Sequence, residues 1–437
     1  MNRIPSLPSE PSTVTLEKPV YSGSCLAHVD GKAVFVPFTL PGERARVHIV
    51  EKKSGYASAE VNEILTASPD RVVPACPYFG VCGGCNYQHA SYPAQLAFKQ
   101  AILRETLERA GLSLPATISV LSGEPWEYRN RVRLAVDSDG NPGYRERGSH
   151  AIIPVRECPI AAPALIEAAL MFAETARMVA PTLKPTEIAL FTNADQSALL
   201  LTLVAAEVHK VPFEELAQTL KKRIPAMKGA ELVLEAEEGG QPRIVAQWGA
   251  KSLVYRAAGF DYRVDHGAFF QVNRWLVDPL VEAVLAEYKG ALAWDLYAGV
   301  GLFARQLAKR FDRVVAVESA PASTDALAAN LKGSRGVPVR SATLDFLRRP
   351  QAKGNTTQAV PDLIVVDPPR TGLGADTTTL LAKIAAPAMV YVSCDPATLA
   401  RDLAALIASG YAIRSVTVAD LFPQTFHLET VVHLLRA

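Results

Sequence analysis

Ala293-Trp294-Asp295-Leu296-Tyr297-Ala298-Gly299-Val300-Gly301-Leu302-Phe303-Ala304 is the stretch that decides the fold. Its apolar start predicts a buried strand, its glycines a tight turn, and residues 302–309 a helix. A second apolar strand, Val314 to Glu318, follows and ends in an acid. Strand, helix and strand in this order predict a parallel sheet covered by helices, which is an α/β fold.

The glycine turn also predicts a ligand site. Glycines let a ligand approach the backbone, and the acid that ends the second strand, Glu318, can accept hydrogen bonds from both hydroxyls of a ribose. Gly299-x-Gly301-x-x-Ala304 equally fits a dinucleotide fingerprint. The turn alone therefore leaves the cofactor open.

Two later strands end in reactive residues. Leu363 to Val366 ends in Asp367-Pro368-Pro369-Arg370, and Met389 to Val392 ends in Ser393-Cys394-Asp395-Pro396. Because ligands bind at the carboxyl ends of parallel strands, we expect this thiol and carboxylate to face one crevice. A lone cysteine is more often a small buried hydrophobe, but its neighbours reverse that interpretation. A dehydrogenase needs neither group, so S-adenosylmethionine is favoured, with Asp345 after the third strand placed to meet its adenine.

A third reactive residue is expected near the end of the chain. Glu429 follows Phe422-Pro423-Gln424-Thr425-Phe426-His427-Leu428 and opens an apolar strand. A carboxylate that enters a buried strand is costly unless it is paired or used. The alternatives are an ion pair or an exposed strand edge.

Composition describes an ordinary globular protein. The 437 residues are 49% hydrophobic and 20% charged, with a net charge of +1, so two or three domains with proper cores are expected and any polyanion surface must be a local patch. No apolar run is long enough to cross a bilayer, and no signal peptide is expected. These features predict a cytoplasmic protein without membrane contact.

The chain divides into four predicted parts. Residues 1–12 predict a disordered leader, and 13–68 a barrel of short strands separated by turns at Asp30-Gly31, Pro41-Gly42 and Ser54-Gly55. Such a barrel either binds oligonucleotides or is a solvated β-module. Residues 69–262 form a central α+β domain, in which a helix over 92–111 is expected to pack on the last domain, 263–437.

Thiols in the central domain predict a metal centre. Cys76, Cys82 and Cys85 lie within ten residues among glycines, and Cys158 follows later before a proline. Four thiolates suit an iron–sulfur cluster or structural zinc, and the three-plus-one layout favours the cluster. The spacing differs from the Cys-x3-Cys-x2-Cys of radical enzymes, which disfavours radical chemistry. Cys25, without partners, is expected to be inert.

Three arginines predict a nucleic-acid contact. Arg129, Arg131 and Arg133 alternate, so a strand would place them on one face beside Tyr144. Arginines beside aromatics suit phosphate contacts and base stacking, whereas the alternative is a solvated edge strand.

Taken together, these motifs resemble the RNA 5-methyluridine methyltransferases over nearly the whole chain from residue 13. The barrel resembles a TRAM domain, and the four cysteines place the chain nearer the iron–sulfur-containing ribosomal-RNA members than the cluster-free transfer-RNA enzyme. The resemblance implies a Rossmann-like methyltransferase domain, S-adenosylmethionine, a structural [4Fe–4S] cluster and a monomer. It implies the following roles: Cys394 as nucleophile, Glu429 as base, Asp367 as a catalytic and cofactor residue, and Gln271, Tyr297, Gly299, Glu318 and Asp345 as cofactor contacts. Leu302 departs from the family pattern, where some members carry an Asn.

The implied reaction is C5-methylation of a uridine in RNA. Large-subunit 23S ribosomal RNA is the first expectation and transfer RNA the second. Two other hypotheses stay open: an amino-group methyltransferase, which shares an Asp-Pro-Pro-like motif but needs no thiol, and a non-catalytic RNA-binding or assembly protein.

Overall fold

The computed structural model describes residues 11–207, 212–236, 242–349 and 360–436. The chain forms two compact units. Unit 1 holds the chain up to Glu105 together with 146–149 and 422–427, and unit 2 holds the remainder. Most of the predicted leader lies outside the described residues, and the first strand begins at Ser12, inside the leader as we bounded it.

Unit 1 contains a barrel-like sheet of six strands. They are β1 (Ser12–Thr15), β2 (Lys18–Val20), β3 (Ser24–Val29), β4 (Lys32–Pro37), β5 (Arg44–Lys52) and β6 (Tyr56–Thr66), in the order β1-β5-β6-β4-β3-β2. Alternate residues, such as Val34 and Val36 on β4 and Ala45 and Val47 on β5, point into one apolar core. The predicted strands are confirmed, while β2 and β3 carried too little alternation to be predicted.

The loop after the barrel is fastened by a buried ion pair. The Glu43 carboxylate, fully buried, accepts hydrogen bonds from Arg71 Nε at 2.6 Å and Nη2 at 2.8 Å, and from the backbone N–H groups of Leu40 and Ser68. These bonds hold the pKa of Glu43 below its usual range, although burial alone would raise it. Helix α1 (Tyr92–Arg109) follows and ends before Gly111, whose φ of 77° and N–H bond to the Glu108 carbonyl confirm the predicted stop.

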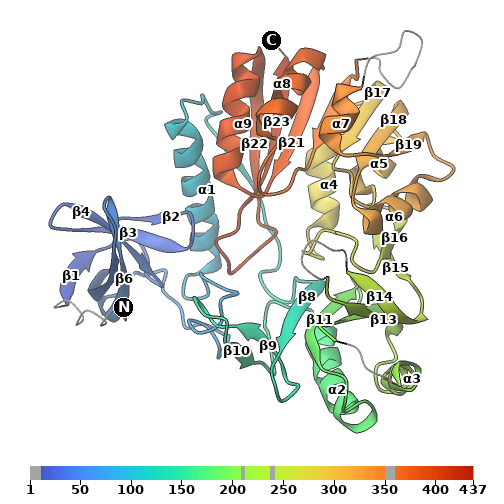
Figure 1. The fold of residues 1–437 in the computed structure, drawn as a ribbon. Coiled ribbons are helices and arrows are strands. Elements are labelled where there is room, and N and C mark those ends of the chain that lie inside the picture. The colour runs from blue at the N-terminus through green and yellow to red at the C-terminus, as the bar shows by residue number, and fades with distance from the viewer. Residues whose placement is uncertain (1–10, 208–211, 237–241, 350–359, 437) are drawn as a thin grey trace. The chain divides into compact units, whose positions relative to one another are not determined.

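Unit 2 begins with a mixed seven-stranded sheet in the order β10-β9-β8-β11-β12-β13-β14. Its elements are β8 (Arg131–Val136), β9 (Pro142–Arg145), β10 (Ile152–Pro154), α2 (Pro163–Val179), β11 (Pro185–Thr192), β12 (Leu199–Ala205), α3 (Phe213–Arg223), β13 (Met227–Leu234) and β14 (Arg243–Gly249). Helices α2 and α3 cover one face (Figure 1). The buried side of α2 repeats at Leu165, Ala169, Phe172 and Ala176, which is helical spacing.

The second sheet of unit 2 has eight strands in the order β19-β18-β17-β20-β21-β23-β22-β7. Its elements are β7 (Ser119–Leu121), α4 (Val277–Leu285), β17 (Gly290–Leu296), α5 (Leu302–Leu307), β18 (Phe311–Glu318), α6 (Pro321–Leu331), β19 (Gly336–Arg340), α7 (Thr343–Arg348), β20 (Leu363–Val366), α8 (Gly374–Ile384), β21 (Ala388–Ser393), α9 (Pro396–Ala408), β22 (Tyr411–Ala419) and β23 (Glu429–Arg436). The hairpin β15 (Ser252–Ala257) and β16 (Phe260–Asp265) precedes it (Figure 1). Every residue of β20 and β21 is buried, because helices cover both faces of a parallel sheet.

Strand order fixes where a ligand can bind. The chain runs outward from β17 through β18 to β19, then returns to place β20 on the other side of β17. This reversal is a topological switch point, and the crevice at its carboxyl edge is where α/β sheets bind ligands. Tyr297 follows β17 at this edge and Asp367 follows β20. No helix among the described residues is long and apolar enough to cross a membrane.

Candidate active site

The turn after β17 departs from ordinary backbone geometry. Tyr297, Gly299 and Gly301 have φ angles of 63°, 55° and 90°. A Cβ on Gly301 would lie 2.7 Å from Leu327 Cδ1, so this position requires glycine for space as well as for conformation. The Gly299 N–H donates to Glu318 Oε2 at 2.8 Å, which fastens the turn to the end of β18.

A narrow cleft opens at this turn. Its walls are formed by Phe269, Phe270, Gln271, Tyr297, Ala298, Gly299, Val300, Leu302, Phe303 and Asp367. Four predicted cofactor contacts line it: Gln271, Tyr297, Gly299 and Asp367. Two others do not: Glu318 lies behind the turn, and Asp345 is exposed on the first turn of α7. Leu302, which we left out of the predicted site, does line the cleft.

Asp367 joins the cleft to the predicted reaction centre. Gln271 Nε2 lies 3.4 Å from Asp367 Oδ2, so the amide donates to the carboxylate. Burial raises the pKa of Asp367 to about 7. A carboxyl group with this pKa changes its protonation near neutral pH.

Cys394 and Glu429 are neighbours across two antiparallel strands. Ser393 of β21 is paired with Thr430 of β23, so the next pair in this register is Cys394 with Glu429. Burial, then the negative charges of Glu429 and Asp367, raise the pKa of the Cys394 thiol to about 12. The thiol, the cleft carboxyl and the tail carboxyl therefore meet at one edge, as the sequence predicted.

Arg370 is a site residue that we had not assigned. Its positive charge opposes the rise in the pKa of both Cys394 and Glu429. Burial, then the charge of Asp367, raise the pKa of Glu429 well above the usual value, and the Glu429 side chain is only 5% exposed. Arg370 closes the motif Asp367-Pro-Pro-Arg370, so the sequence signal was present, but we had read it for its carboxylate only.

Comparisons with known proteins show the family to which this chain is similar. Residues 354–437 match the family described as tRNA (Uracil-5-)-methyltransferase, and 10–61 match the TRAM domain. A 23S rRNA (uracil(1939)-C(5))-methyltransferase RlmD of Halomonas elongata is 34% identical, covering 93% of this chain and 85% of its own. An RNA methyltransferase of Streptomyces avermitilis, described as uncharacterized, is 36% identical over 94% of this chain and 95% of its own.

The chain belongs to the RNA (uracil-5-)-methyltransferase family. The fold agrees with a crystal structure of the tRNA (uracil-54, C5)-methyltransferase of Pyrococcus abyssi, determined with S-adenosyl-L-homocysteine. That structure has a TM-score of 0.77 and 24% identity and covers 97% of this chain and 99% of its own. This RNA (uracil-5-)-methyltransferase therefore combines an N-terminal TRAM domain with a methyltransferase fold.

The structure places two of the three predicted arginines of the enzyme, Arg131 and Arg133, on strand β8. β8 begins only at Arg131, and the backbone of Arg129 pairs instead with Ala161 and Asn273. The Arg131 guanidinium lies 4.4 Å from the centre of the Phe191 ring. Arg133 is 70% exposed and pairs with Glu187 at 2.6 Å. Of the three, Arg133 is the one whose guanidinium is most open to a phosphate.

The four predicted metal ligands of the enzyme lie in both units. Cys76, Cys82 and Cys85 belong to unit 1 and Cys158 to unit 2, and all four are half-buried without disulfides. Gly84 N–H donates to Cys82 Sγ at 3.4 Å, which is the type of contact that stabilises a thiolate ligand. Among the described residues, however, no group of three or more Cys, His, Asp or Glu side chains is arranged to hold a metal ion. Four thiols are the donor set of a cluster or a zinc site.

Proposed function

We propose that the enzyme methylates C5 of a uridine in 23S ribosomal RNA, with S-adenosylmethionine as methyl donor and Cys394 as nucleophile. The observation that carries the proposal is the electrostatic contact of the Cys394 thiol with Glu429, Asp367 and Arg370 at one strand edge. The ribosomal substrate is supported by relatives named 23S rRNA (uracil(1939)-C(5))-methyltransferase.

The residues of the glycine turn fit the proposed cofactor. Gln271, Tyr297, Gly299 and Asp367 line the cleft, and Glu318 and Asp345 follow the next two strands. S-Adenosylmethionine would be held by these six residues and, when bound, supplies an electrophilic methyl group on a positively charged sulfur. Asp367 links this cleft to Cys394, because its charge acts on the thiol.

Cys394 begins the proposed reaction because C5 of uracil is too weak a nucleophile on its own. The Cys394 thiolate forms an S–C6 bond, and the C5–C6 π electrons move toward the C4 oxygen, which makes an enolate. C5 of this enolate would then bond to the methyl group supplied by S-adenosylmethionine, whose bond to sulfur breaks and leaves a neutral thioether. The pKa of about 12 keeps the thiol protonated in the free enzyme, so the positive charge of Arg370 matters for the thiolate.

Glu429 completes the proposed reaction as a base. After methylation, C5 carries both the methyl group and its original hydrogen. The Glu429 carboxylate removes that proton, the C5–C6 double bond forms again, and the S–C6 bond breaks to release the Cys394 thiolate. The raised pKa of Glu429 makes its carboxylate a stronger base than an exposed glutamate. The target base must leave its stack to reach the thiol.

Mass spectrometry with 5-fluorouridine RNA tests this function. Fluorine replaces the hydrogen that Glu429 removes, so the enzyme incubated with S-adenosylmethionine should remain bonded to the RNA through Cys394. The variant Cys394→Ser should give no adduct, whereas an amino-group methyltransferase would keep its activity in this variant. The proposal would be contradicted if wild-type enzyme binds the cofactor but gives no adduct with any uridine-containing RNA. A non-catalytic RNA-binding function would then remain.

The RNA class is a separate comparison. We expect 5-methyluridine in 23S ribosomal RNA transcripts and little in transfer RNA transcripts, as measured by nucleoside mass spectrometry after equal incubation. If only the transfer RNA transcripts are methylated, the proposed ribosomal substrate is wrong and transfer RNA is the substrate. We also propose that the enzyme acts as a monomer, which light scattering during size-exclusion chromatography would measure directly.

We propose further that Cys76, Cys82, Cys85 and Cys158 bind a structural [4Fe–4S] cluster. The support is the donor set: four thiols, with a backbone amide already directed at Cys82. Enzyme purified without oxygen should contain about four iron and four sulfide per chain. Cys158→Ser should lose the iron, while Cys25→Ala, in the apolar barrel core, should retain it. If the purified enzyme contains zinc in place of iron, the proposed iron–sulfur cluster is wrong, while the four cysteines remain the proposed metal ligands.

A further inference from the structure

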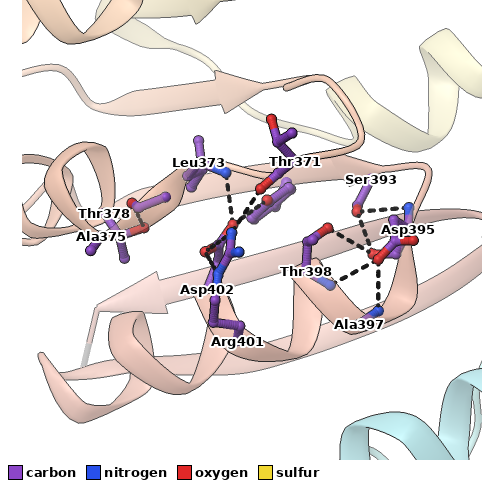
Figure 2. Close-up of polar contacts among 12 residues, drawn as sticks. Thr371, Leu373, Ala375, Thr378, Ser393, Asp395, Ala397, Thr398, Arg401 and Asp402 are labelled. Carbon is purple, nitrogen blue, oxygen red and sulfur yellow. Dashed lines mark hydrogen bonds and ion pairs between the residues drawn. The ribbon is translucent and has the colours of Figure 1, made fainter.

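Helix α9 begins directly after the proposed nucleophile Cys394, and hydrogen bonds fix its first turn. Asp395 is the N-cap of α9, and its Oδ1 accepts hydrogen bonds from the N–H groups of Ala397 at 3.0 Å and Thr398 at 2.9 Å (Figure 2). Pro396 occupies the first helical position, where its fixed φ suits a helix start. Cys394, which directly precedes this cap, therefore has little freedom to move relative to α9.

Side chains on one face of α9 make hydrogen bonds to the backbone of residues 370–373, which follow Asp367-Pro368-Pro369. Thr398 Oγ1 donates to the Arg370 carbonyl at 3.1 Å, and Arg401 Nη2 donates to the Thr371 carbonyl at 2.9 Å. Asp402 Oδ2 accepts from the Leu373 N–H at 2.7 Å. Figure 2 shows Arg401 and Asp402 of α9 beside Thr371 and Leu373 of that segment. Residues at i, i+3 and i+4 lie on one face of a helix, so the three bonds act together.

One of these hydrogen bonds is made by the buried carboxylate of Asp402. Asp402 is 2% exposed and also accepts a hydrogen bond from the Tyr391 hydroxyl at 2.8 Å, and Tyr391 lies on β21, the strand that ends at the nucleophile. Gly372 lies against it: a Cβ there would be 2.5 Å from Asp402 Oδ2 and 2.7 Å from Arg401 Nη2. The segment can approach α9 this closely only because Gly372 has no side chain.

We infer that Thr398, Arg401 and Asp402 form a clamp that positions Arg370 relative to Cys394. The three are positioning residues, because their side chains bond the backbone of residues 370–373 rather than the reacting groups. Since Cys394 directly precedes the N-cap of the helix that carries the clamp, the backbone at Arg370 and the nucleophile are both held by α9. This inference rests on the proposed role of Cys394 as the nucleophile.

The placement of Arg370 matters because of the charges around the thiol. Glu429 on β23 and Asp367 after β20 oppose the thiolate, and Arg370 favours it. A backbone released from α9 would let the guanidinium retreat toward water. The thiolate would then lose its cationic neighbour while keeping both carboxyl neighbours.

Alkylation of Cys394 measures this effect without RNA. Iodoacetamide reacts with the thiolate, so its rate at a fixed mildly alkaline pH, followed by peptide mass spectrometry, reports the thiolate fraction. The test variants are Thr398→Val and Arg401→Met. Thr398→Ser restores the hydroxyl, and Arg401→Lys restores one donor. Thr379→Val is the matched control, because Thr379 Oγ1 also donates to a backbone carbonyl at 2.8 Å, but within α8.

We expect Cys394 to be alkylated about three- to tenfold more slowly in Thr398→Val and Arg401→Met, as expected when a cation moves a few ångströms from a charge. The serine and lysine variants and Thr379→Val should react at the wild-type rate. In both test variants the kcat for RNA methylation should fall, while the KM for RNA should stay unchanged. Wild-type alkylation rates in both test variants, or equal slowing in Thr379→Val, would overturn the clamp.

Two further results keep the test decisive. If Thr398→Val does not fold, the pair Arg401→Met and Arg401→Lys decides by the same rates. If wild-type enzyme forms no adduct with 5-fluorouridine RNA, the proposed function fails, and the alkylation rates still judge the clamp on their own.

Discussion

Glu429 is the buried carboxylate to which we assign proton removal. It is the first residue of β23, nearly buried, and lies beside Cys394 in the strand register. Burial raises its pKa, and Arg370 opposes that rise. Its proposed work comes only after methylation, so removing the carboxylate should separate methyl transfer from product release.

We therefore predict that Glu429→Gln accumulates a methylated covalent adduct with ordinary uridine RNA. Without a base, the C5 proton stays in place and the S–C6 bond cannot break, so turnover should fall about 10²- to 10⁴-fold. Denaturing gel electrophoresis and mass spectrometry would detect the adduct on Cys394. Glu429→Gln together with Cys394→Ser should give none. Rapid turnover by Glu429→Gln would assign the base to another group.

Individual side chains differ in how far the sequence predicts them. The sequence placed Cys394 and Asp367 directly after apolar strands and Glu429 at the start of one, and because β23 is antiparallel to β21 these positions lie at the same edge of the sheet. The alternation of Arg129, Arg131 and Arg133 does not show where the strand begins, and β8 begins at Arg131. The clamp residue Asp402 gave no signal, since a lone acid in a helix usually faces water.

The turn between β17 and α5 is the element on which the cofactor site depends. Gly301 is the N-cap of α5 in the left-handed region, and its missing side chain leaves room for Leu327. A methyl group on residue 301 would destabilise the turn in two ways. One is backbone strain, and the other is the displacement of a neighbour beneath the cleft.

We predict that Gly301→Ala weakens S-adenosylmethionine binding by about tenfold or more, because backbone strain of about 1–2 kcal/mol adds to displacement of Leu327. Gly333→Ala is the matched control: its φ is 72°, but a Cβ there would meet nothing within 4 Å. Calorimetric titration should give wild-type affinity for the control, although both variants lose thermal stability. Equal loss of affinity in both would mean that strain alone is responsible.

Some elements could not be predicted at all. β7 has three residues and no clear pattern, yet it adds to the edge of the catalytic sheet by pairing with β22. That sheet therefore takes a strand from the segment that we assigned to the central domain. The short buried strands β20 and β21 formed where the sequence predicted strands, since continuous apolar runs are typical of buried parallel strands.

At the scale of the molecule, the two units carry buried carboxyl groups with opposite pKa shifts. In unit 1, hydrogen bonds hold the pKa of Glu43 below its usual range against the effect of burial. In unit 2, burial raises the pKa of Asp295, on β17, to about 8, and the charges of Asp367 and Glu318 add to the rise. The units should therefore respond to pH in opposite directions.

The signs follow from proton binding. Folded unit 2 holds the Asp295 proton between about pH 4 and pH 8 while the unfolded chain does not, so its free energy of unfolding falls as pH rises through this window. Glu43 stabilises unit 1 above the pKa of an unfolded glutamate, and that contribution is lost as pH falls through the lowered pKa.

We predict that hydrogen exchange, compared between variant and wild type at each pH, separates the two units. Asp295→Asn should protect peptides of β17 to β21 more than wild type at pH 8, by about a few kcal/mol, and this excess should shrink as the pH falls toward 4. Glu43→Gln should expose peptides of β3 to β6 at pH 7 by about 3 kcal/mol, because Arg71 loses its buried partner. That difference should shrink as the pH falls through the lowered pKa of Glu43, where the wild-type carboxylate also becomes neutral. A difference that does not change with pH in either unit would mean that packing, and not the charge of these carboxylates, sets its stability.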